Sequence, residues 1–136
     1  MTLTTNDIAE YISNSDSVKR LYRLALDQGF WPDFPDYRIG KLSGYLEAAK
    51  IEDITTIDNL VSENFPVIQK FVAEIFAHRK NGQPWRLNSV FLCELVLILK
   101  YPKIFGRDFL AQNDWDEEIA EIISKAAIRL SPTNAS

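Results

Sequence analysis

Apolar residues recur at intervals of three and four along most of this chain, with polar residues between them. That spacing places the apolar side chains on one face of an α-helix. It predicts helices, some of them separated by short polar or glycine-containing breaks, over these residues: 6–14, 16–28, 38–50, 64–80 and 115–130. Further short helices are expected after residue 55 and within 102–111.

Residues that favour helix ends mark several of these boundaries. Gly29 is a natural stop for the second helix, and Asp114 with Glu117 has the spacing of a capping box before the last one. Gly40 and Gly44, four residues apart, weaken the helix propensity of 38–50 but would allow the close approach of a neighbouring helix. The expected N-terminal caps, all short polar side chains, are Thr5, Ser15, Thr55 or Thr56, Asn64, and Asn88 or Ser89.

The run from Val90 to Leu99 is apolar on every side and is interrupted only by Cys93 and Glu94. Its ten residues are about half of what a membrane span needs, so we expect a buried helix at about 89–100. The predicted fold is therefore all-α: a compact single-domain bundle of six to seven helices around this central helix. The domain is expected to cover 1–136, with 131–136 as a flexible tail.

Composition agrees with one ordinary globular domain. The chain has 136 residues, of which 46% are hydrophobic and 25% are charged, and its formal net charge is −4. No basic block suggests non-specific nucleic-acid binding. The single cysteine, Cys93, excludes an intramolecular disulfide and a cysteine-based zinc site. These features predict a cytoplasmic protein that uses no cofactor and no membrane.

Two loops combine aromatic and charged side chains. Two prolines keep residues 30–37 out of a regular helix, and 78–86 concentrates basic side chains around a tryptophan. Their rings either face solvent, where Trp and Arg are typical anchors of protein interfaces, or cover the core; the sequence leaves both open. The candidate partner-binding residues in these loops are Trp31, Phe34, Arg79, Lys80, Trp85 and Arg86.

The functional hypothesis favoured by the sequence is a non-enzymatic protein-interaction module, such as a small cytosolic adaptor, regulator or inhibitor. The second hypothesis is nucleic-acid or nucleotide-ligand binding through the 78–86 loop, because cationic aromatic loops can hold phosphates and stack bases. The overall acidity of the chain makes a protein the preferred partner. Association with further copies of the chain stays open.

A metal-dependent hydrolase is the least favoured hypothesis. The pattern Glu117-Glu118-x-x-Glu121 resembles the first half of the metal motif of all-α nucleoside triphosphate pyrophosphatases, but no acidic residue follows to supply the second half. Such acids also simply stabilise a helix N-terminus.

Glu94 is the one charged side chain within the apolar run from Val90 to Leu99. If it is trapped in the core, burial raises the pKa of its carboxyl group, as a general acid or base requires. The alternatives are that it marks a narrow strip by which the central helix reaches solvent, or that it pairs with an arginine. His78 is the only histidine, so we assign no catalytic residue and no metal ligand.

Overall fold

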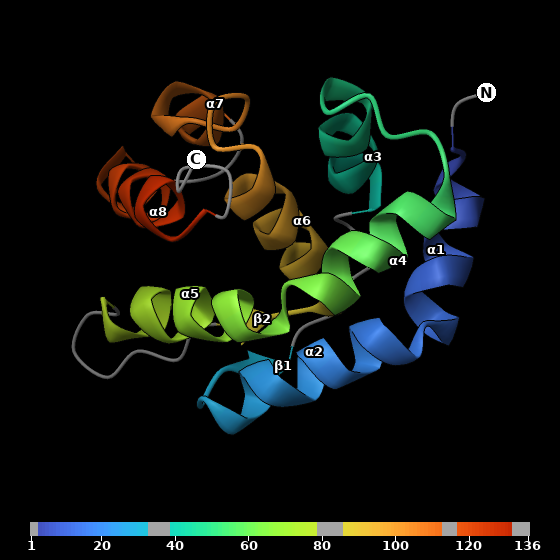
Figure 1. Ribbon diagram of the computed structural model, residues 1–136, viewed down its shortest axis with the longest axis horizontal. Helices are drawn as coiled ribbons and strands as arrows, with labels where there is room; N and C mark the ends of the chain where they lie inside the picture. The colour runs from blue at the N-terminus through green and yellow to red at the C-terminus, as the bar shows by residue number, and fades with distance from the viewer. Residues whose placement is uncertain (1–2, 33–38, 79–85, 113–116, 132–136) are drawn as a thin grey trace.

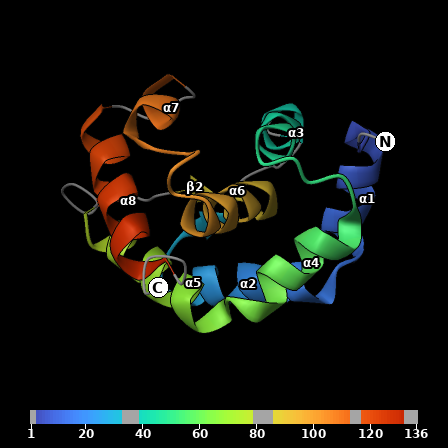
Figure 2. The ribbon, with the colours of Figure 1, turned by 45° about the horizontal axis from the view of Figure 1, so that its top comes forward.

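An apolar helix, α6 (Ser89–Lys100), runs through the middle of the computed structural model, and other helices lie around it (Figures 1 and 2). It begins after Asn88, whose side-chain oxygen accepts a hydrogen bond from the N–H of Phe91 at 2.7 Å. Nine of its residues are buried, which confirms the central helix predicted from the sequence. The structure describes residues 3–32, 39–78, 86–112 and 117–131.

Eight helices make up most of the described residues, which confirms the all-α fold with one helix more than the six to seven expected. Besides α6, the helices are α1 (Thr5–Asn14), α2 (Asp16–Asp27), α3 (Ile39–Ala48), α4 (Ile54–Glu63), α5 (Phe65–Ala77), α7 (Arg107–Gln112) and α8 (Glu117–Leu130). Five of them, α2, α3, α4, α5 and α8, pack against α6, while α1 packs on α3 and α7 on α8. In the described ranges no helix is long and apolar enough to cross a membrane.

Two helices end in the same hydrogen-bonded turn. After α2, the N–H of Gly29 donates to Leu26 and that of Phe30 donates to Ala25, and Gly29 has a φ of 107°. This Schellman arrangement needs a left-handed residue, and Gly29 is the predicted stop. After α3 the same pair of bonds is made with Lys50 in the left-handed position, at a φ of 58°. The sequence gives no sign of this second turn, because lysine has no preference for that conformation.

Two predicted caps are displaced by one to three residues. α1 begins after Thr4 rather than Thr5, and the Thr4 side chain forms a complete capping box with the first turn. α4 begins after Asp53 rather than after Thr55 or Thr56. In both places several neighbouring side chains are capable caps, so the local pattern alone does not select one.

The close approach that Gly40 and Gly44 would allow is not made by any described part of the chain. A Cβ atom built at either glycine meets no described atom within 4 Å, because α3 buries Leu42, Tyr45 and Leu46 on its other side. Asp114, the expected cap of the last helix, lies outside the described residues, as does most of the expected tail. Ser131, where that tail begins, is buried, and its N–H donates to the carbonyl of Ala127.

Candidate functional site

The two aromatic and charged loops meet through their backbones. Strand β1 (Trp31–Pro32) pairs in parallel with β2 (Arg86–Leu87), and Trp31 lies opposite Arg86. The sequence did not predict these strands, which are only two residues long. The Trp31 side chain is 52% exposed, so this ring faces solvent rather than covering the core. Of the remaining candidates, only the backbone of Arg86 is described; Phe34, Arg79, Lys80 and Trp85 lie outside the described residues.

The described acids at the start of α8 are not gathered around a common point. Glu117 and Glu118 are exposed, Glu117 lies 3.9 Å from Arg107, and Glu121 pairs with Lys125 at 3.2 Å. No group of three or more His, Cys, Asp or Glu side chains in the described part of the chain is arranged to hold a metal ion. Glu117 and Glu118 lie in the first turn of α8, where negative charge is favourable.

Glu94 is completely buried in the middle of α6, so it does not mark a strip that reaches solvent. Its neighbour Cys93 is buried as well. Burial, reinforced by the nearby carboxylates of Glu94 and Asp58, raises the pKa of the Cys93 thiol to about 12. A thiol in this state is not nucleophilic near neutral pH. Glu94 is therefore packed within the core.

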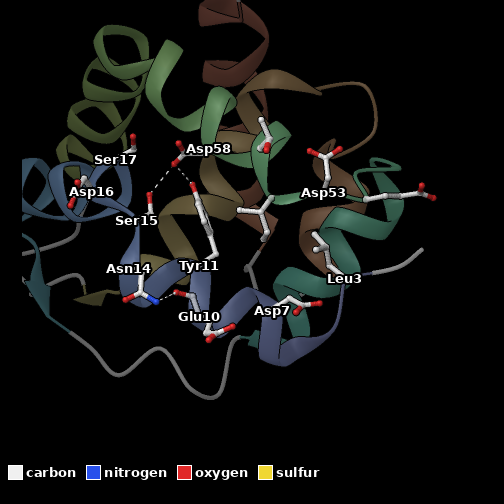
Figure 3. A pocket seen from close by; sticks show the side chains of 13 residues that line it. Leu3, Asp7, Glu10, Tyr11, Asn14, Ser15, Asp16, Ser17, Asp53 and Asp58 are labelled. Carbon is white, nitrogen blue, oxygen red and sulfur yellow. Dashed lines mark hydrogen bonds between the residues drawn. The ribbon is translucent and has the colours of Figure 1, made fainter.

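An open groove of about 840 Å³ lies where α1, the start of α2 and the start of α4 come together (Figure 3). We call it the acidic groove. Its lining contains six carboxylates and, among the described residues, no lysine, arginine or histidine. The lining residues are Leu3, Asp7, Glu10, Tyr11, Asn14, Ser15, Asp16, Ser17, Glu52, Asp53, Ile54, Thr55 and Asp58.

Helix capping accounts for part of this acidity. The Asp7 carboxylate accepts a hydrogen bond from the N–H of Thr4 at 3.0 Å, and the Asp53 carboxylate accepts from the N–H of Thr56 at 2.8 Å. These backbone bonds are the main reason why the pKa values of Asp7 and Asp53 lie below the ordinary range for aspartate. Both carboxylates are therefore negatively charged at neutral pH. Asp16 lies in the first turn of α2, where negative charge is also favourable.

Asp58 holds the three helices of the groove together. Its Oδ1 atom accepts hydrogen bonds from the hydroxyls of Tyr11 and Ser15, each at 2.9 Å (Figure 3). Tyr11 belongs to α1, Ser15 lies between α1 and α2, and Asp58 belongs to α4. The Tyr11 ring is buried, and this burial is the main reason why the pKa of its hydroxyl is raised. Tyr11 therefore stays a neutral donor that fixes the Asp58 carboxylate in place.

The chemistry of the groove suits binding better than catalysis. The Ser15 hydroxyl, which donates to the Asp58 carboxylate, also accepts the N–H of Val18 as the cap of α2. A hydroxyl bonded on both sides within the fold is poorly placed to attack a substrate. His78 follows the end of α5 and does not line the groove. What remains is a concave surface with a concentrated negative charge.

Sequence reasoning missed this groove although each of its parts carried a signal. Caps and first-turn acids at the starts of α1, α2 and α4 are local features that a pattern can suggest. Their meeting depends on contacts between Asp58 and two residues 47 and 43 positions earlier, which no local pattern reveals. Net charge did not help either, because the chain as a whole is only modestly acidic.

No protein-family model, no curated protein and no solved structure matches this chain. The fold and the two surfaces described above, the acidic groove and the exposed Trp31, are therefore the features that bear on function.

Proposed function

We propose that this protein is a non-enzymatic interaction module whose acidic groove binds a lysine- or arginine-rich segment of a partner protein. The observation that carries the proposal is the combination of a concave surface with six carboxylates and no basic side chain among its described lining residues. Clefts lined by charge of one sign concentrate the opposite charge and accelerate its association. A cationic segment is the protein ligand that complements such a surface.

The groove also offers apolar contact for long basic side chains. Leu3 and Ile54 line it beside the carboxylates, together with part of Tyr11. Lysine and arginine carry aliphatic stems that cover apolar surface while their charged ends reach polar groups. A mixed lining of this kind therefore fits such side chains better than it fits a small, strongly hydrated metal ion, which agrees with the absence of a metal-ligand cluster in the described ranges.

Asp58 supplies a pre-organised acceptor. Both hydroxyl donors use its Oδ1 atom, so the carboxylate is oriented before a ligand arrives. Pre-organisation reduces the entropy that binding costs, and a charge-assisted hydrogen bond to a carboxylate is stronger than a neutral one. We therefore expect Asp58 to contribute more to binding than the exposed carboxylate of Glu10, and Asp58→Asn, which removes the charge and keeps the shape, to weaken binding more than Glu10→Gln.

Nucleic acid is disfavoured as an occupant of this groove, because the carboxylates repel phosphate. The alternative of nucleic-acid binding through 78–86 concerns a loop that lies almost wholly outside the described residues. It predicts retention on a polyanion column with steep salt dependence. Binding of a basic segment by the acidic groove predicts instead that the protein is not retained on that column and is retained on a matrix that carries lysine.

Titration of the full chain with fluorescently labelled hexalysine, followed by anisotropy, tests the proposal. The informative variant is Glu10→Lys, which reverses one charge in the groove, and its matched control is Glu47→Lys, which reverses the charge of an exposed acid on α3 that does not line the groove. Two unit charges about 8 Å apart in water interact by about 0.5 kcal/mol. Reversing one charge against two lysines therefore costs about 2 kcal/mol at low salt, more than a tenfold loss of affinity.

The expected result is salt-sensitive binding that Glu10→Lys weakens more than tenfold and that Glu47→Lys changes much less. Equal effects of the two reversals would show that only the net charge attracts the peptide, and the groove proposal would then fail. Absence of binding by the unmodified chain at low salt would also overturn it. Circular dichroism of each variant shows whether the fold is intact.

Trp31 is a second candidate surface for the same kind of function. Its exposure and its position at the junction of the two loops favour a role as an apolar anchor. If a partner uses both surfaces, Trp31→Ala weakens its binding without unfolding the domain, because the exposed ring contributes little to the core. Hexalysine binding, in contrast, is expected to be unchanged by Trp31→Ala.

A further inference from the structure

We draw no further inference here: the strongest candidate outside the acidic groove, the exposed stripe of small residues Gly40, Gly44 and Ala48 on α3, carries no proposal because nothing in the described part of the structure shows what covers it.

Discussion

Glycine-to-alanine substitution is expected to have opposite effects at two positions of this fold. Gly44 lies in the middle of α3, and a Cβ atom there would meet none of the described atoms within 4 Å. Gly29 ends α2 with a φ of 107°, and a Cβ atom there would lie 2.9 Å from Cζ of Phe76. Gly44 can therefore accept a side chain, whereas Gly29 needs both a backbone conformation that favours glycine and the absence of a Cβ atom next to Phe76.

The magnitudes follow from these two environments. Alanine is favoured over glycine inside an exposed helix by about 0.8 to 1 kcal/mol, so Gly44→Ala is expected to raise the free energy of unfolding by that amount. At Gly29 the left-handed backbone costs a side chain about 1 to 2 kcal/mol. The crowded Phe76 ring, which packs edge-on against Phe30 at 5.0 Å, must also move. Overpacking of this kind costs about 1 to 3 kcal/mol. Together the two effects give a loss of about 2 to 5 kcal/mol for Gly29→Ala.

Urea unfolding followed by circular dichroism measures both effects, with the denaturant slope serving as a check that the same transition is compared. In thermal unfolding, about 1 kcal/mol corresponds to a shift of roughly 3 to 5 °C for a chain of this size. A destabilised Gly44→Ala would refute the reasoning, because it would mean that another surface approaches α3 closely. A neutral Gly29→Ala would show that the turn after α2 is not built as described.

Three further predictions concern other local features. Lys50→Gly is expected to raise the free energy of unfolding by about 1 kcal/mol, because glycine adopts the left-handed conformation at this position without strain; equal urea midpoints for the two proteins would contradict it. Cys93, with a pKa of about 12, is expected to resist a thiol reagent at neutral pH until urea unfolds the chain, and rapid labelling of the native protein would show that the thiol is accessible. The folded-state pKa values of Asp7 and Asp53 are lowered, so their stabilising effect is full above the unfolded value of about 3.9 and is lost as pH falls through the folded values. The double variant Asp7→Asn, Asp53→Asn should therefore lose less stability between about pH 5 and pH 2 than the unmodified chain, and identical acid profiles would argue against these two caps.

Most of the helical framework could be predicted because its causes are local. The run of apolar residues in α6 and the caps Ser15 and Asn88 belong to sequence patterns that act within a few residues. Gly29 was predictable for the same reason. The left-handed Lys50 was not, because the surrounding packing imposes its conformation against the preference of the residue.

The candidate site was less predictable because it depends on tertiary contacts. The sequence drew attention to Trp31 through its aromatic neighbours but could not show whether the ring faces solvent. It also could not show that Tyr11 and Ser15 contact Asp58, since Asp58 lies more than forty positions after each of them. Glu94 stands out in the sequence as a charge within an apolar helix, and only the packing shows that it is completely buried.

Mapping of backbone amide chemical shifts during titration with hexalysine tests the central claim most directly. The account predicts that the shifts that change first belong to the residues around the acidic groove, above all Glu10, Ser15, Asp53 and Asp58, and that those of the exposed acid Glu47 stay in place. Changes concentrated around Trp31, changes spread evenly over all acidic surfaces, or no change at low salt would contradict the claim that this groove is the binding site.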